Sequence, residues 1–268
     1  MTDVPLKALD LKLGKRVDQG GLDAIPRAIS RQSLQPPARM KGFDLWNAYE
    51  TSFLLPSGKP VVLHLLAAYA ADTQAIVESK SFKLYLNSMN HQVFPRLENF
   101  QSTVSQDLEN VVGGRVELTC FLPDQSPQSQ PLPGLWLDTL TPRNIPKNYQ
   151  PEILEWESGN GTFCFHSHLL RTQCPITNQP DWGSVVIKGE GPRQPLQAPL
   201  LAYLISFRNR PDFHETCCEA IFTDLYRLLQ PDSLTVACRY TRRGGLDINP
   251  VRTTMVDYPR KFTPSWRQ

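Results

Sequence analysis

The stretch FDLWNAYETSFLLPSGKPVVLHLLAAYAA, residues 43–71, indicates the fold. It contains two apolar runs with strand character, residues 43–55 and 60–69, and the sequence SGK between them suits a hairpin turn. The apolar run over 60–71 is too short to cross a bilayer, and His64 interrupts it. The stretch therefore predicts an antiparallel hairpin within a folded core, and we expect no membrane partner.

Two helices and a strand are predicted to follow this hairpin. The first helix covers residues 78–90, where apolar side chains recur at helical spacing, namely Phe82, Tyr85, Leu86 and Met89. A second helix fits residues 99–112, and residues 115–122 have strand character again. Residues 123–133 are rich in Pro, Gln and Ser and predict a linker or long loop, and residues 134–140 predict a further strand.

The second half of the chain repeats this order of elements. The predicted elements are strands over 161–170 and 183–188, helices with one apolar face over 196–205 and 213–229, and a strand over 234–240. A last extended piece runs to about residue 256. Each half thus follows the order strand, strand, helix, helix, strand, although the two halves share negligible sequence identity.

This pseudo-repeat predicts an α+β fold in which antiparallel sheets carry helices on one face. A chain of 268 residues is long enough for two modest domains. We expect an irregular lead-in over residues 1–42, which are rich in Pro, Gly and charge, an N-terminal unit over 43–150, and a C-terminal unit over 151–268.

The composition excludes several classes of protein. A hydrophobic share of 40% supports real cores, and a net charge of +2 without a basic stripe makes nucleic acid an unexpected partner. The first residues lack the apolar core of a signal peptide, so we expect a cytoplasmic protein with reduced thiols. The chain has six cysteines and no CxxC pair, which argues against a zinc ribbon or a redox dithiol.

A loop with the sequence RTQCPITNQPDWGSV, residues 171–185, carries the first candidate site. Two prolines and a glycine hold Cys174 in a rigid loop, where catalytic groups concentrate. A thiol attacks only as thiolate, and Asp181 could take its proton and later deliver it. The alternative is that Cys174 is a buried small apolar residue and Asp181 forms a turn.

The segment NRPDFHETCCEAIF, residues 209–222, supports two interpretations. Asp212 with Glu215 three positions later is a capping-box pattern at the start of a helix. The same carboxylate of Glu215, kept ionised by the helix dipole, could instead accept hydrogen bonds from a guanine-like edge. His214 beside it could donate a proton near neutral pH.

Two further segments are candidates for binding anions. In ESKSFKLY, residues 78–85, Glu78 could bind a base edge while Lys80 and Lys83 meet phosphates at a helix start; the alternative is a generic helix with solvated lysines. In RYTRRGGLDINP, residues 239–250, two arginines precede a Gly-Gly pair, and glycine lets backbone N–H groups approach an oxyanion. A charged hairpin turn explains that pattern equally well.

A histidine pair raises the question of a metal. His166 and His168 alternate on one predicted strand face and could share a zinc ion. The sequence offers no clear third ligand, so we expect no metal.

These segments together resemble the NADPH-dependent 7-cyano-7-deazaguanine reductases. ESKSFKLY is similar to the signature that separates this family from its zinc-dependent relatives, the GTP cyclohydrolase I enzymes. CPITNQPDWGS, residues 174–184, is similar to the loop of the family's nucleophile, and FHE, residues 213–215, and RYTRRGGLDINP match as well. The resemblance covers most of the chain from about residue 40 and is to the longer, two-domain form.

The resemblance implies a fold, a reaction and an assembly. The fold is the tunnelling fold, in tandem units whose antiparallel sheets join across subunits into a barrel, and the long form is a homodimer. The reaction is the reduction of the nitrile of 7-cyano-7-deazaguanine to a primary amine in queuosine biosynthesis. Two NADPH are used in turn, because nitrile to amine needs four electrons, and no metal takes part.

The resemblance also implies roles for individual residues. Cys174 adds to the nitrile carbon to give a covalent thioimide, Asp181 handles the proton, and His214 protonates or stabilises the imine. The substrate is held by Glu78 and Glu215, with Phe213 and Ser79 beside them. The candidates for contact with NADPH are Ser79, Lys80, Lys83, Arg242, Arg243 and Gly244.

Two rival functions remain open from the residues themselves. One is a zinc enzyme of the same fold acting on a pterin-like substrate, with His166, His168 and Cys174 as ligands. The other is a binding or scaffold module without catalysis, in which Cys174 is structural.

Overall fold

The computed structural model describes residues 21–260 and 262–268. Residues 43–71 form the predicted hairpin, because β2 (Lys41–Leu54) and β3 (Pro60–Ala70) pair antiparallel. The register shifts once, between Ala48 and Thr51, where a bulge bends the strand.

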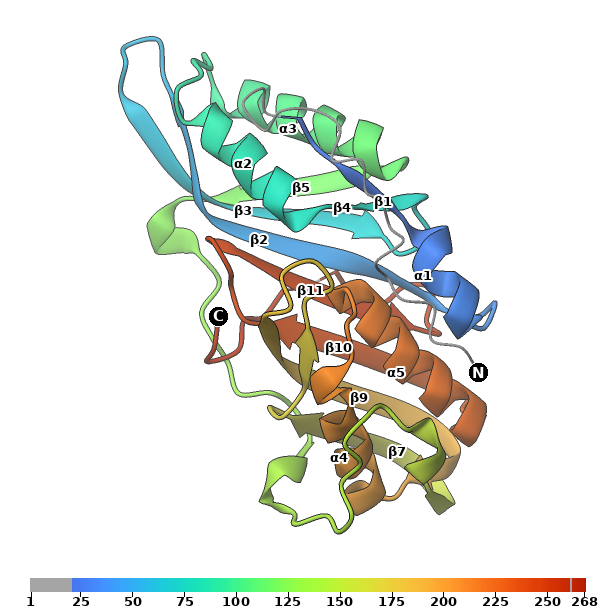
Figure 1. Cartoon of the computed structure of the whole chain (residues 1–268). Helices are drawn as coiled ribbons and strands as arrows, with labels where there is room; N and C mark the ends of the chain where they lie inside the picture. The colour runs from blue at the N-terminus through green and yellow to red at the C-terminus, as the bar shows by residue number, and fades with distance from the viewer. Residues whose placement is uncertain (1–20, 261) are drawn as a thin grey trace.

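The described residues repeat the predicted order of elements in each half (Figure 1). The other elements of the first half are β1 (Ala24–Pro26), α1 (Arg27–Leu34), β4 (Ala75–Val77), α2 (Ser79–Met89), α3 (Leu97–Val112), β5 (Val116–Phe121) and β6 (Leu135–Trp136). Those of the second half are β7 (Trp156–Ser167), β8 (Arg171–Gln173), β9 (Pro180–Pro195), α4 (Gln197–Ser206), α5 (His214–Leu229), β10 (Ser233–Tyr240) and β11 (Leu246–Thr253).

One sheet runs through both halves of the described chain, in the order β5-β3-β2-β11-β10-β9-β7-β6. Its strands are antiparallel except at β6, which pairs parallel with β7, and the short β8 pairs with β9 beside this path. The last strand, β11, lies between β2 of the first half and β10 of the second. The two halves are therefore joined edge to edge by backbone hydrogen bonds.

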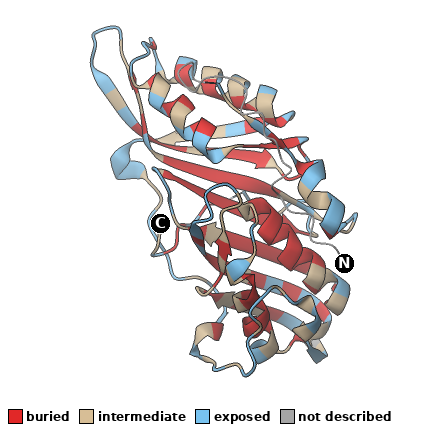
Figure 2. Ribbon diagram, viewed as in Figure 1, coloured by how far each residue is buried: buried red, intermediate tan, exposed pale blue. Residues whose placement is uncertain are grey.

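The helices pack on one face of this sheet and enclose two apolar cores (Figure 2). In the first half, Trp46 of β2 packs edge-on against Phe82 of α2. In the second half, alternate residues of β10 point at α5 and are fully buried, namely Leu234, Val236, Cys238 and Tyr240. This arrangement confirms the α+β class with an antiparallel sheet and helices on one face, as expected for tandem tunnelling-fold units.

Two local predictions were wrong. Residues 24–34, inside the expected irregular lead-in, form β1 and α1, because β1 finds a partner in β4 that its own three residues do not reveal. The strand expected over 134–140 covers only Leu135–Trp136, because the chain turns into a 3₁₀ helix at Leu137–Thr139. The division into units at 43–150 and 151–268 stays a prediction.

In the part of the chain that the structure describes, no helix combines the length and apolar character needed to cross a membrane.

Candidate functional site

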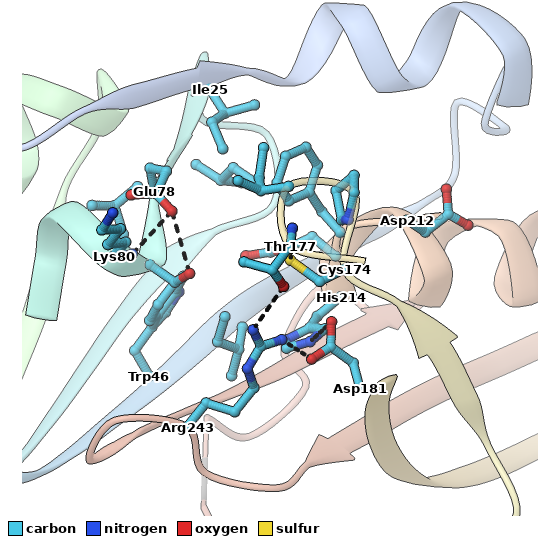
Figure 3. Close-up of a pocket in the computed structure, with 18 residues that line it drawn as sticks. Ile25, Trp46, Glu78, Lys80, Cys174, Thr177, Asp181, Asp212, His214 and Arg243 are labelled. Carbon is cyan, nitrogen blue, oxygen red and sulfur yellow. Dashed lines mark hydrogen bonds and ion pairs between the residues drawn. The ribbon is translucent and has the colours of Figure 1, made fainter. Parts of the chain in front are cut away.

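A pocket lies where the junction of β4 and α2 faces the loop of Cys174 and the start of α5 (Figure 3). It brings together side chains far apart in the sequence. The predicted residues that line it are Glu78, Ser79, Lys80, Cys174, Asp181, Phe213, His214, Glu215 and Arg243. The two motifs of the first and second halves therefore meet in one place.

Cys174 is held in a turn between β8 and β9. Its N–H donates to the carbonyl of Gln179 at 2.8 Å, and its carbonyl accepts from the N–H of Asn178 at 2.9 Å. The N–H of Thr177 donates to Sγ at 3.5 Å. The side chain is half-buried at the wall of the pocket, so its sulfur is both fixed and accessible.

Asp181, at the start of β9, is the charged centre of the pocket. Its carboxylate pairs with the guanidinium of Arg243 and lies 3.4 Å from Nε2 of His214. Burial alone would raise the pKa of Asp181, but His214 and Arg243 outweigh it and hold that pKa below its ordinary value. Asp181 is therefore held as an ionised carboxylate in the pocket that the thiol of Cys174 also lines.

His214 is the first residue of α5, and its ring is fixed by stacking. It lies parallel to the ring of Tyr240, with centroids 3.7 Å apart and an angle of 10° between the planes. Its Nδ1 is buried and has no hydrogen-bond partner among the described residues. The imidazole thus has one nitrogen toward Asp181 and one still to be satisfied.

Glu215 is a buried carboxyl group without a partner for Oε1 among the described residues. It is 3% exposed, and burial, followed by the charge of Asp44, raises its pKa to about 8. The capping-box interpretation is wrong, because α5 begins after Phe213 with no side-chain cap, and Asp212 instead pairs with Arg210 at 2.6 Å. A buried acid facing a pocket with a free oxygen is a site for donors from a ligand.

Glu78 reaches the same pocket while capping α2. Its Oε1 accepts from the N–H of Lys80 at 2.9 Å and its Oε2 from the N–H of Ser81 at 2.6 Å. These bonds fix the orientation of the carboxylate. Because each carboxylate oxygen can accept twice, Glu78 can still receive bonds from a ligand.

A second pocket adjoins the first and is basic. The predicted residues that line it are Ser79, Lys80, Lys83, His214, Arg243 and Gly244. Gly244 has a φ of +60°, and a Cβ there would come within 2.8 Å of Cδ of Lys83, so glycine lets the lysine lie over the turn. Two lysines and an arginine around a glycine turn fit the phosphates of a dinucleotide.

Arg242 is placed apart from its predicted neighbours. Its guanidinium lies 3.8 Å above the ring centroid of Tyr49, and it lines neither of the two pockets. The pairing of Arg243 with Asp181 and the apolar walls of the pocket, Ile25, Trp46 and Ile248, were not predicted. No sequence signal near Ile25 pointed to the site, because its place depends on the pairing of β1 with β4.

The histidine pair has other partners. Nδ1 of His166 lies 3.0 Å from the carbonyl of Pro133, and Nδ1 of His168 lies 2.7 Å from Oγ of Ser184. Within the described ranges, no group of three or more His, Cys, Asp or Glu side chains could hold a metal ion. The ligand set of the zinc alternative is therefore not assembled there.

A thiol, a carboxylate and an imidazole that converge beside a basic pocket are the groups of an enzyme with a nucleophilic cysteine. Residues 15–120 match the family described as nitrile reductase, 7-cyano-7-deazaguanine-reductase N-term, and residues 180–258 match the family described as QueF-like protein. The chain belongs to the NADPH-dependent 7-cyano-7-deazaguanine reductases, a family of oxidoreductases.

Individual relatives support this membership. The chain is 44% identical over 237 residues to the NADPH-dependent 7-cyano-7-deazaguanine reductase of Legionella pneumophila strain Corby, an alignment that covers 86% of this chain and 82% of the relative. For strain Lens the identity is 45% over the same coverage. The crystal structure of the archaeosine synthase QueF-Like in the apo form aligns with a TM-score of 0.29 at 17% identity, over 37% of this chain and 91% of that chain.

Proposed function

We propose that this chain reduces the nitrile of 7-cyano-7-deazaguanine to the aminomethyl group with NADPH, in queuosine biosynthesis. Membership of the family supports the substrate and the cofactor, since the relatives carry this activity in their names. The observation that carries the proposal is the convergence of Cys174, Asp181 and His214 in one pocket with Glu215, whose Oε1 has no hydrogen-bond partner among the described residues.

Covalent capture of the nitrile is the first proposed step. Sγ of Cys174 adds to the nitrile carbon, and Asp181 takes the thiol proton and delivers it to the nitrile nitrogen, which leaves a thioimide. A nitrile carbon is a modest electrophile, so a soft thiolate suits it. The ionised state of Asp181, held by Arg243 and His214, supports its role as the base.

The two carboxylates of the pocket are proposed to hold the deazaguanine edge. Glu215 has a free buried oxygen and Glu78 has lone pairs to spare, so each can accept N–H bonds from the base. Phe213 and Ser79 lie beside them in the pocket wall. An N–H donor from the base replaces the solvation that Glu215 lacks, which favours its ionised form when the ligand is bound.

The first reduction takes place while the carbon is held on sulfur. NADPH, when bound in the adjoining basic pocket, supplies one hydride in each of two rounds. The sulfur of Cys174 leaves between the rounds, and its departure gives an imine that the second hydride reduces to the amine. His214, fixed against Tyr240 and close to Asp181, is positioned to protonate the nitrogen in these steps. Lys80, Lys83, Arg243 and Gly244 are the proposed phosphate contacts, with Arg242 more remote.

From the resemblance to the family we also propose that the protein is a homodimer and that it is located in the cytoplasm. A dimer would be tested by sedimentation of the purified chain. Sedimentation as a monomer would contradict it.

The activity is tested by following nicotinamide absorbance with purified protein and 7-cyano-7-deazaguanine. We expect two equivalents of NADPH to be oxidised for each nitrile, and no oxidation by Cys174→Ala. Cys164→Ala is the matched control, because Cys164 is another partly exposed thiol, placed in β7 outside the pocket. A wild-type protein that leaves NADPH untouched, or full activity in Cys174→Ala, would contradict the proposal.

A further inference from the structure

Gln173, the residue before Cys174, belongs to a very short strand. β8 has three residues, and in it Gln173 pairs with Pro180 of β9, the residue that precedes Asp181. The backbone of Gln173 therefore sets the distance between the chain segments that carry the thiol and the carboxylate. So short a strand makes few bonds of its own, so its place depends on the segment that pairs with its other edge.

The other edge of Gln173 is bonded to the segment that leads into α5. The N–H of Gln173 donates to the carbonyl of Arg210 at 2.9 Å, and its carbonyl accepts from the N–H of Asp212 at 3.2 Å. Asp212 stands two positions before His214, the first residue of α5. Two backbone hydrogen bonds thus join the loop of Cys174 to the start of the helix that carries the imidazole.

The side chain of Arg210 holds this segment in place. Its guanidinium lies 3.9 Å from the ring centroid of Tyr149, and its Nε lies 2.6 Å from Oδ2 of Asp212. The ion pair lacks the geometry of a hydrogen bond, so charge and stacking hold the guanidinium. The two side chains are only 17% and 10% exposed, so solvent screens their attraction little. The carboxylate of Asp212 points away from the sulfur of Cys174 (Figure 3), which fits a structural partner of Arg210 and not a reacting group.

The ring beneath Arg210 is itself anchored to two helices. The hydroxyl of Tyr149 donates to Oδ2 of Asp224 on α5 at 2.6 Å, and the hydroxyl of Tyr203 on α4 donates to the same oxygen at 2.6 Å. The ring of Tyr149 also packs edge-on against that of Phe207, with centroids 5.0 Å apart. Arg210 therefore rests on a rigid platform.

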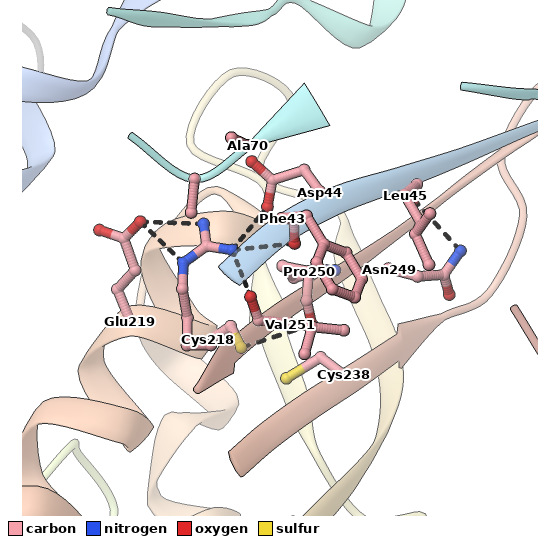
Figure 4. A network of polar contacts seen from close by, with 12 residues as sticks. Phe43, Asp44, Leu45, Ala70, Cys218, Glu219, Cys238, Asn249, Pro250 and Val251 are labelled. Carbon is pink, nitrogen blue, oxygen red and sulfur yellow. Dashed lines mark hydrogen bonds and ion pairs between the residues drawn. The ribbon is translucent and has the colours of Figure 1, made fainter. Parts of the chain in front are cut away.

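The helix α5 is anchored by contacts that do not involve Arg210 (Figure 4). Glu219 accepts two bonds from Arg252 of β11, at 2.9 and 3.0 Å. The thiol of Cys218 donates to one carbonyl of β10 and one of β11, each at 3.5 Å. We therefore expect loss of the Arg210 guanidinium to leave α5 in place and to free only the segment before it.

We propose that Arg210 is a positioning residue, which sets the place of Cys174 relative to His214. It does so by keeping its own segment bonded to the backbone of Gln173. Arg210 is not among the residues that line the pocket, so it acts on the reaction through these neighbours. The inference rests on the proposed function, because it assigns the capture of the nitrile to Cys174.

The test measures capture of the nitrile and binding of the nitrile separately. The full chain is mixed with saturating 7-cyano-7-deazaguanine at pH 7.5 without NADPH, and mass spectrometry follows the covalent adduct. Arg210→Gln should form the adduct roughly tenfold to a hundredfold more slowly, because a displacement of about 1 Å costs that much. Calorimetry in a Cys174→Ala background should show a change in affinity of about twofold or less, because Glu78 and Glu215 stay in place.

Alkylation by iodoacetamide separates alignment from access. This reagent needs only an accessible thiolate, so Cys174 should react within about twofold of the wild-type rate in Arg210→Gln. A loop that had come loose from the protein would react much faster. Arg193→Gln is the matched control, because it removes a guanidinium that lies 4.1 Å from the ring centroid of Trp156, in β9 outside the pocket. It should change neither capture nor binding.

Two variants of Tyr149 test the platform. Tyr149→Phe keeps the ring beneath Arg210 and loses the bond to Asp224, so it should capture the nitrile at close to the wild-type rate. Tyr149→Leu loses the same bond and the ring, so it should slow capture as Arg210→Gln does. Should Arg210→Gln not fold, this pair of variants decides the question.

Three results would overturn the inference. They are an adduct formed at the wild-type rate by Arg210→Gln, equal losses of capture and of binding, and a marked rise in the rate of alkylation. Equal capture by Tyr149→Phe and Tyr149→Leu would also count against it. If the wild-type protein forms no adduct with the nitrile, it is the proposed function that fails.

Discussion

Glu215→Gln should make the protein more stable and worse at binding its ligand. Burial raises the pKa of Glu215 from 4.5 to about 8, so the folded protein holds a proton that the unfolded chain releases. A carboxyl whose pKa is raised by folding contributes a stability that is fully present below pH 4.5 and is lost as the pH rises toward 8. At about 1.4 kcal/mol for each pH unit, the loss at pH 7 is about 3 kcal/mol.

A glutamine cannot lose this stability, because it does not ionise. It leaves a buried amide in place of the unpartnered acid, which costs about 1 kcal/mol. The net gain at pH 7 is then about 2 kcal/mol, which corresponds to a rise in melting temperature of roughly 5 °C for a chain of this size. Binding of 7-cyano-7-deazaguanine should weaken roughly tenfold to a hundredfold, since a charge-assisted hydrogen bond becomes a neutral one.

The assay is denaturant unfolding of both proteins at pH 5 and pH 8. The free energies of unfolding should be nearly equal at pH 5, and the glutamine variant should be the more stable at pH 8. Calorimetry with 7-cyano-7-deazaguanine measures the predicted loss of binding affinity. A difference in stability that is the same at both pH values, or a variant less stable than wild type at pH 8, would refute the reasoning.

Two other substitutions probe the thiol and the basic pocket. Asp181→Asn should slow a single turnover of the nitrile by a hundredfold or more, because the amide cannot take the thiol proton, while nitrile binding changes little. Rapid-quench kinetics measures the single-turnover rate, and an unchanged rate would show that Asp181 does not transfer the proton. Gly244→Ala should raise KM for NADPH several-fold, because the methyl group meets Lys83 at a φ of +60°. Gly58→Ala, at a φ of +81° in open space, carries similar backbone strain and should leave that KM unchanged in steady-state assays.

The sequence predicted the parts of the fold that depend on local pattern. Alternating and helical periodicity located β2, β3, α2, α3, α5 and β10, because each buries a continuous apolar face. β1 and α1 were missed, since Ala24–Pro26 is a strand only through its pairing with β4, and α1 is held by ion pairs of Arg27 and Arg31. These contacts join residues far apart in the sequence, so a pattern among neighbouring residues does not reveal them.

The candidate site shows the same division. The sequence motifs predicted that four residues belong to one site, and the structure places them in one pocket, namely Cys174, Asp181, His214 and Glu215. The pairing of Arg243 with Asp181 could not be predicted, because a pair of arginines before two glycines fits an anion site of any kind. Arg242, predicted beside it, lies over the ring of Tyr49 instead.

The position of β11 in the sheet has a consequence for how the chain folds during synthesis. The edge of β2 that pairs with β11 has no partner until residues 246–253 have been made, some 200 positions later. Until then the nascent chain exposes a long, apolar strand edge, and within the described chain no strand joins the two halves of the sheet. Pairing across so large a separation closes slowly, so we expect the finished site to form late in folding, and chains stopped before Leu246 to aggregate.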